Sequence, residues 1–170
     1  MPDIQKLKLL FKTAVGELIY YRDQHSTHIL SLKAQLQQKL SAQILNSTVE
    51  QLVYTENLLE IHEILIAYCN LAPNIIKEFD VKMVTGQALE ISQFIQFTAS
   101  KTKSKSTKEL DAMIMKYYKQ LGTNALDKRV FSLVNIDKDY VNQRIVEAGG
   151  KVEDKVDQEI EQMNKLLGGL

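Results

Sequence analysis

The sequence predicts an all-α protein in which a long antiparallel helical hairpin carries several shorter helices packed on it. Apolar residues recur every three or four positions over two consecutive long stretches, and no segment alternates convincingly as a strand. Only two prolines occur, and the seven glycines mostly punctuate the helical patterns. Two long helices joined by a short turn must fold back on each other, because neither can bury its apolar stripe alone.

The first long helix is predicted from Asp3 to about Leu40, and its apolar stripe also contains His25 and His28. The stripe consists of Ile4, Leu7, Phe11, Ala14, Leu18, Tyr21, Leu32 and Leu36. Basic residues fall beside it within an arc of about 80°, and this basic flank consists of Lys8, Lys12, Arg22 and Lys33. A basic flank can lie on an anionic membrane or another polyanion. It can equally be an ordinary solvated face.

The second long helix is predicted from Ser41 or Ala42, with Ser41 as its N-cap, to about Phe79, and Pro73 is expected to kink it or end it early. Its apolar side consists of Leu52, Leu58, Leu59, Ile61, Leu65, Ile66 and Cys69. The opposite side gathers acids within an arc of about 60°, and this acidic edge consists of Glu56, Glu60 and Glu63. The pattern indicates a scaffold helix, and a charged residue in place of Leu59 is expected to unfold the hairpin.

Shorter helices are predicted after the hairpin, with Gly122 and Gly149 ending the second and third of them: about 87–100, 107–121, 137–148 and 153–167. The lysine- and serine-rich stretch 101–106, KTKSKS, has no apolar anchor and is predicted to be a mobile linker. We expect a single domain over residues 1–170. Its parts are the hairpin at 3–79, the packing helices at 87–148 and a C-terminal amphipathic helix at 153–167.

The C-terminal helix is short, acidic and amphipathic. The residues expected to contact a partner are Val156, Ile160, Met163, Leu166 and Leu167. Such a helix can dock in a groove of another protein. It can equally cap its own hairpin as the final core helix, and the sequence alone does not decide between the two.

No enzymatic motif is complete. His62 and Glu63 begin an HExxH-like string, but Ile66 stands where the second histidine is needed, and Gly-rich phosphate loops, GxSxG and CxxC are absent. His25 and His28 offer two metal ligands, yet no neighbouring set completes a tetrahedral site. We expect no catalysis, metal or cofactor, and we expect Cys69 to be a buried, inert thiol.

Charge and hydropathy restrict the partners and the compartment. Lys plus Arg and Asp plus Glu both number 21, so no global field attracts nucleic acid or membrane, and no specific nucleic-acid partner is expected. The opening MPDIQKLKLLFKTAV lacks a signal-peptide pattern, and no run approaches the length of a membrane span. These features predict a cytoplasmic protein.

The order VExLxxxENLLExxEILxxYCxL within 49–71 resembles the second helix of the increased-sodium-tolerance family. The matching positions are Val49, Glu50, Glu56, Asn57, Leu59, Glu60, Glu63, Ile64, Leu65, Tyr68, Cys69 and Leu71. The resemblance runs from LKLLFKTAVGELIYYRDQ to VNIDKDYVNQRIVEAGG. In the latter segment the residues that match a helix folded back on the hairpin are Val134, Asn135, Val141 and Ile145.

This resemblance implies an ESCRT-III-like core that modulates the Vps-type AAA ATPase in the multivesicular body pathway or in cytokinetic abscission. The implied partners are C-terminal tails of ESCRT-III subunits, an anionic endosomal membrane bound peripherally, copies of itself or relatives in a polymer, and the ATPase's MIT domain. Relatives carry Leu-x-x-Arg-Leu-x-x-Leu motifs for that domain, whereas Glu159 here takes the place of the basic residue. The alternative is a monomeric helical adaptor that binds amphipathic peptides without assembling on membranes.

Overall fold

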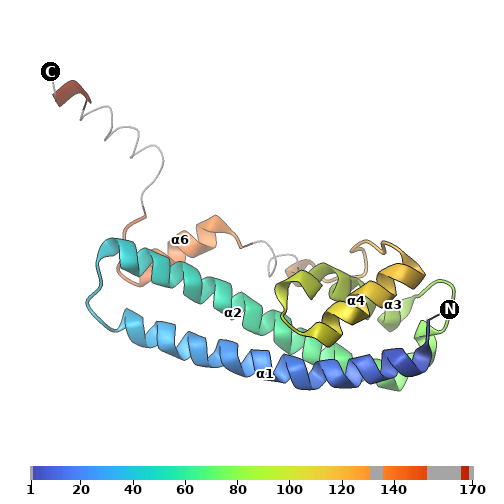
Figure 1. Ribbon diagram of the computed structural model, residues 1–170. Helices are drawn as coiled ribbons and strands as arrows, with labels where there is room; N and C mark the ends of the chain where they lie inside the picture. Colours follow the sequence, from blue (N-terminus) through green and yellow to red (C-terminus); the bar gives the residue numbers. More distant parts are fainter. Residues whose placement is uncertain (1, 131–135, 153–165, 169–170) are drawn as a thin grey trace.

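The computed structural model describes residues 2–130, 136–152 and 166–168, and this part of the chain contains helices and no strand. Helix α1 (Ile4–Leu36) and helix α2 (Ala42–Leu71) run antiparallel, side by side, and form a long hairpin (Figure 1). The predicted fold class is therefore confirmed.

Polar caps fix where both hairpin helices begin. The Asp3 carboxylate accepts a hydrogen bond from the Lys6 backbone N–H at 3.1 Å, and the Ser41 hydroxyl accepts one from Ile44 N–H at 3.4 Å. Each satisfies an N–H group that has no partner inside its helix. Both predicted starts are correct, whereas α1 ends at Leu36, a few residues before the predicted end.

Pro73 ends the second long helix, as predicted. Its ring cannot supply the backbone N–H that the next turn requires, so α2 stops at Leu71 and the chain continues as the 3₁₀ segment η1 (Ala72–Phe79). Ile75 leaves the helical region with φ −119° and ψ 26°. The chain is thereby redirected around the end of the hairpin.

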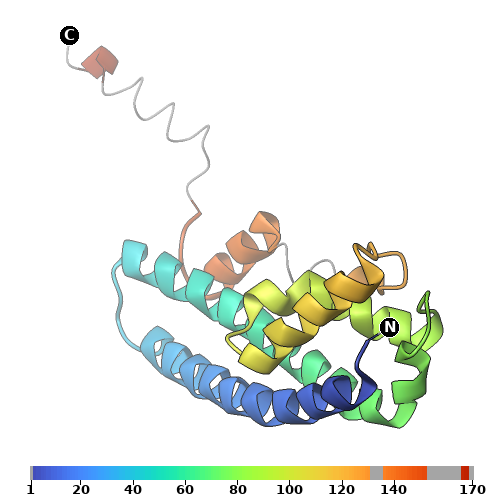
Figure 2. The same ribbon diagram turned by 45° about the vertical axis from the view of Figure 1, so that its right-hand side comes forward.

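The shorter helices occupy two separate places on the hairpin. Helices α3 (Gly86–Thr98) and α4 (Lys105–Tyr118), joined through the single turn η2 (Ala99–Lys101), pack at the end that holds the N-terminus (Figures 1 and 2). Helix α6 (Lys138–Glu147) lies instead along the N-terminal half of α2.

The main core sits where α1, α2, η1, α3 and α4 meet. Its largest fully buried side chains include Phe11, Phe79, Phe94, Leu7, Leu18, Ile61, Leu65, Ile91, Ile95, Leu110 and Ile114. The rings of Phe11 and Phe79 approach to 5.4 Å between centroids. Cys69 is completely buried in this core, and burial raises the pKa of its thiol to about 12, which confirms the predicted inert cysteine.

The apolar stripes differ from prediction near the middle of the hairpin. His28 is exposed and His25 is half-buried, because Ile29 and Leu32 take the core positions of α1. Leu59 is also only half-buried, at the edge of a small cluster with these two residues. A charge at Leu59 would therefore lie at the edge of this cluster rather than deep in the core, and the expected unfolding of the hairpin stays a prediction.

The stretch 101–106 is a fixed part of the structure, which corrects the prediction of a mobile linker. Its lysines alternate with buried Thr102, Ser104 and Ser106. Glu17 of α1 accepts hydrogen bonds from the Ser104 hydroxyl at 3.1 Å and from the Ser106 N–H and hydroxyl at 3.0 and 2.5 Å. Burial alone would raise the pKa of Glu17, but these hydrogen bonds lower it. Hydrogen bonds to Glu17 thus fix this stretch to α1, although it has no apolar anchor.

Helix α4 also differs at both of its ends. It begins at Lys105, inside the predicted linker, with the Ser104 hydroxyl accepting from Thr107 N–H at 3.2 Å. It ends at Tyr118 rather than near Gly122, because Lys119 takes a φ of 58°. Gln96 of α3 stabilises the following turn by donating to the Lys119 carbonyl at 2.9 Å.

Candidate partner-binding surface

An acidic groove of about 300 Å³ lies between α2, α3 and residues 127–130. Its lining consists of Glu60, Ile64, Tyr68, Glu90, Asp127, Arg129 and Val130. Three carboxylates therefore face one guanidinium. The acidic edge predicted on α2 supplies Glu60, while the other acids come from segments that the sequence did not place beside it.

The floor of the acidic groove is apolar and aromatic. The Tyr68 ring meets the buried Phe94 edge to face, with centroids 5.2 Å apart, and its hydroxyl donates to Glu90 Oε1 at 2.7 Å. Burial, together with the Glu90 carboxylate, raises the pKa of Tyr68, so its hydroxyl stays a donor. Ile64 is half-buried and Val130 is buried. The floor thus offers fixed apolar contacts.

The rim of the acidic groove carries the charge. Glu60 is exposed and makes no ion pair with any residue in 2–130, 136–152 or 166–168. Asp127 pairs with Arg129 at 3.3 Å, and both side chains are largely exposed. A groove with an apolar floor and an acidic rim complements an amphipathic helix that presents basic residues beside its apolar ones.

Helix α6 packs on α2 as the sequence predicted. Val141 and Ile145 of α6 are buried against Val49 and Val53 of α2 in a small separate cluster. The cap Asp137 starts the helix, and Gly149, with φ 91°, ends it. Gly150 follows where a Cβ would lie 2.8 Å from an Ile145 methyl group. Val134 and Asn135, which were expected in the same packing, lie outside the described residues.

An ion pair across this contact was not predicted. The Arg144 guanidinium binds the Glu56 carboxylate through both nitrogens, at 2.8 and 3.2 Å, with both side chains partly buried. A bidentate pair of this kind fixes orientation as well as position. The acidic edge is therefore divided, since Glu56 holds α6 while Glu60 faces the acidic groove.

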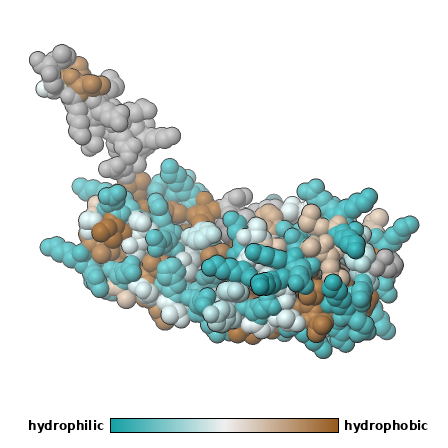
Figure 3. Space-filling model, viewed as in Figure 1, coloured by the Kyte–Doolittle hydropathy of each residue, from teal (hydrophilic) through white to brown (hydrophobic). Residues whose placement is uncertain are grey.

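The basic flank predicted on the first helix lies on α1, away from the acidic groove. In the basic flank, Lys12 and Lys33 are exposed, Lys8 is half-buried, and Arg22 pairs with Asp23 at 3.2 Å. Within the described residues no helix has the length and apolarity to cross a bilayer. The face drawn in Figure 3 is mainly hydrophilic, with separate hydrophobic patches.

The remaining candidates divide between the surface and the undescribed part of the chain. Glu50 and Glu63 are exposed on α2. Leu166 and Leu167 are 75% and 64% exposed, and the other residues proposed for the C-terminal helix lie outside the described residues: Val156, Ile160 and Met163.

His62, which began the failed HExxH string, has a structural role. Its Nδ1 donates to the Leu58 carbonyl at 2.7 Å, which leaves Nε2 to accept from the Thr102 hydroxyl at 3.1 Å. The His25 ring packs edge-on against it at 4.8 Å. Across the described ranges, no three His, Cys, Asp or Glu side chains gather where a metal ion could bind. The buried imidazole thus connects α2 to the stretch 101–106.

These features define an all-α scaffold, with a long hairpin, a returning helix and an acidic groove. No protein-family model matches the chain, and no curated protein matches it significantly. Among solved structures it is similar to the N-terminal domain of Ist1 from S. cerevisiae, crystallised in complex with the Did2 MIM motif. The TM-score is 0.64 at 17% identity, over 87% of this chain and 91% of that one.

The fold is thus that of the Ist1 N-terminal domain. Ist1 gives its name to the increased-sodium-tolerance family that the sequence of α2 resembles. The structural neighbour and the sequence pattern agree.

Proposed function

We propose that this chain is a non-enzymatic ESCRT-III-like subunit that binds other ESCRT-III proteins and modulates the ATPase-driven disassembly of their polymers. The observation that carries the proposal is the acidic groove on a fold whose solved counterpart is bound to a MIM motif. In cells the protein would act on the cytoplasmic side of endosomal membranes or at the abscission site.

The occupant that the acidic groove favours is a C-terminal tail helix of an ESCRT-III subunit. A Leu-x-x-Arg-Leu-x-x-Leu helix presents apolar residues to Ile64 and Tyr68 and a guanidinium to Glu60 and Glu90. The chain's own C-terminal sequence is a poor occupant, because it carries Glu159 at the basic position and is acidic around it. Like charges would meet across the acidic groove.

Helix α6 supports a conformational role for the fold. It is held by one small apolar cluster and by the ion pair of Arg144 with Glu56, and Asn46 donates to the Lys151 carbonyl just after it. The hairpin has two clusters of its own, the main core and the cluster of Ile29, Leu32 and Leu52. A segment with so few buried contacts can leave while the hairpin stays folded. We propose that displacing α6 exposes Val49 and Val53 and converts a closed monomer to a form that joins polymers.

The test is a titration of the purified chain with fluorescent C-terminal tail peptides of ESCRT-III subunits, with an MIT domain of the ATPase as a second ligand. We expect saturable tail binding that Glu60→Lys weakens by about tenfold, the effect of one lost charged contact. Glu50 is also exposed on α2 but lies outside the acidic groove, so Glu50→Lys is the matched control and should bind normally.

Other outcomes of this titration point elsewhere. Binding to the MIT domain would give the C-terminal helix a recruiting role in addition. Tail binding by a chain that stays monomeric and ignores anionic liposomes at low salt would favour the monomeric adaptor. The absence of any tail binding would overturn the proposal and leave the likeness to Ist1 as one of fold alone.

A further inference from the structure

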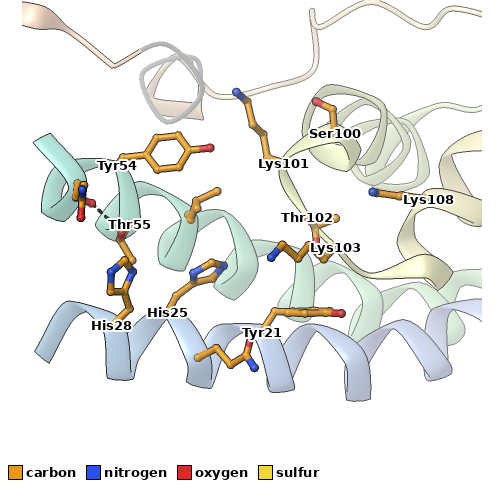
Figure 4. Close-up of a pocket in the computed structure, with 13 residues that line it drawn as sticks. Tyr21, His25, His28, Tyr54, Thr55, Ser100, Lys101, Thr102, Lys103 and Lys108 are labelled. Atoms are coloured by element: carbon orange, nitrogen blue, oxygen red, sulfur yellow. Dashed lines mark hydrogen bonds between the residues drawn. The ribbon is translucent and has the colours of Figure 1, made fainter. Parts of the chain in front are cut away.

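A larger cavity, of about 480 Å³, lies on the hairpin between α1, the N-terminal half of α2 and the connection from η2 to α4 (Figure 4). Its polar lining includes His25, His28 and Tyr54, together with three lysines: Lys101, Lys103 and Lys108. We call it the lysine cavity. It shares no lining residue with the acidic groove. Its volume is typical of sites for small molecules.

The lysine cavity is one-sided in charge. Acidic and basic residues are equal in number over the chain, yet no carboxylate lines this cavity. None of its lysines makes an ion pair with an acid of the described ranges. Burial is the main cause that lowers the pKa of His25 to about 4, with smaller contributions from neighbouring His62, His28 and Lys103.

The lysines project from a fixed backbone. Thr102 hydrogen-bonds to His62, and Ser104 donates to Glu17, so the backbone on both sides of Lys103 is fixed beside the cavity. Figure 4 shows the side chains of Lys103 and Lys108 directed toward the space opposite Tyr54. Groups held in place before a ligand arrives lose less entropy on binding it.

We infer that the lysine cavity binds a phosphomonoester group, on a free small molecule or on a lipid headgroup. Lysine ammonium groups bind phosphate as point charges, and three of them line this cavity without a carboxylate to neutralise them. The Tyr54 hydroxyl and the exposed His28 imidazole are available as further donors. The inference does not depend on the acidic groove.

The test uses the full chain, with amide chemical shifts recorded by NMR during titration with inorganic phosphate and then with inositol trisphosphate. We expect saturable shifts confined to residues around the lysine cavity, and tighter binding of inositol trisphosphate. The double variant Lys103→Ala/Lys108→Ala should weaken binding by about tenfold or more. Lys12→Ala/Lys33→Ala, which removes two exposed lysines outside the cavity, should leave binding unchanged.

Vesicles distinguish the two sources of the phosphate. If the phosphate belongs to a lipid, the protein should bind phosphatidylcholine vesicles that contain a phosphatidylinositol bisphosphate, and Lys103→Ala/Lys108→Ala should weaken this binding. Binding to phosphatidylserine vesicles of equal charge should not depend on these two lysines. If only free inositol trisphosphate depends on these lysines, the ligand is a soluble phosphate. Unsaturable shifts, equal losses in both double variants, or binding of a phosphopeptide in place of inositol trisphosphate would overturn the inference.

Discussion

Replacing Leu65 with aspartate is expected to unfold the hairpin. Leu65 of α2 is fully buried in the main core, where a carboxylate would be desolvated among apolar side chains. Such a substitution costs roughly 4 kcal/mol or more, a large part of the stability of a typical domain. Circular dichroism should show lost helix at room temperature or a far lower melting temperature.

The matched control is Leu30→Asp on α1, where the leucine is 68% exposed. It should change the melting temperature little, because the new carboxylate stays in water. A Leu65→Asp protein that melts like this control would show that the core is wrongly placed.

Ile145→Asp is expected to release α6 while the hairpin stays folded. Ile145 is 3% exposed in the small cluster with Val49 and Val53, so a carboxylate there removes most of what holds α6. The local cost is about 3 kcal/mol, enough to detach a segment with so few buried contacts. Hydrogen exchange should quicken over 138–147 and over the part of α2 that α6 covers, while the main core keeps its protection.

Val146→Asp provides the control, since this neighbour on α6 is 59% exposed and carries the same change in charge. Its exchange should match the unmodified protein. If the proposed closed form is correct, Ile145→Asp should also assemble more readily with ESCRT-III subunits in sedimentation. Global unfolding by Ile145→Asp would show that α6 is part of the same cooperative unit as the hairpin.

Periodicity was enough to predict the hairpin, because the spacing of apolar residues marks each helix and Pro73 marks where the second one ends. It failed for the stretch 101–106, where no apolar residue marks the anchor. There the buried groups are hydroxyls, and their partners Glu17 and His62 lie far away in sequence. Hydrogen bonds between distant segments leave no periodic signal, so a lysine- and serine-rich stretch looked like a linker.

Only the part of the acidic groove that lies on α2 could be predicted, because the rest comes from segments distant in the sequence. The acidic edge follows from helical geometry, and Glu60 does face the acidic groove. The pairing of Glu56 with Arg144 and of Tyr68 with Glu90 needs the packing of α6 and α3 onto α2. The lysine cavity needs three segments together, and a sequence pattern on one helix could not reveal it.

We propose that the acidic groove binds a basic amphipathic helix of an ESCRT-III partner, and a charge-exchange cycle tests this binding most directly. The unmodified chain and Glu60→Lys are each titrated with a tail peptide and with the same peptide carrying glutamate for its central arginine. Each single change should weaken binding by about tenfold, and the two together should restore much of the loss. Losses that simply add, or binding indifferent to Glu60, would contradict binding in the acidic groove and place the partner elsewhere.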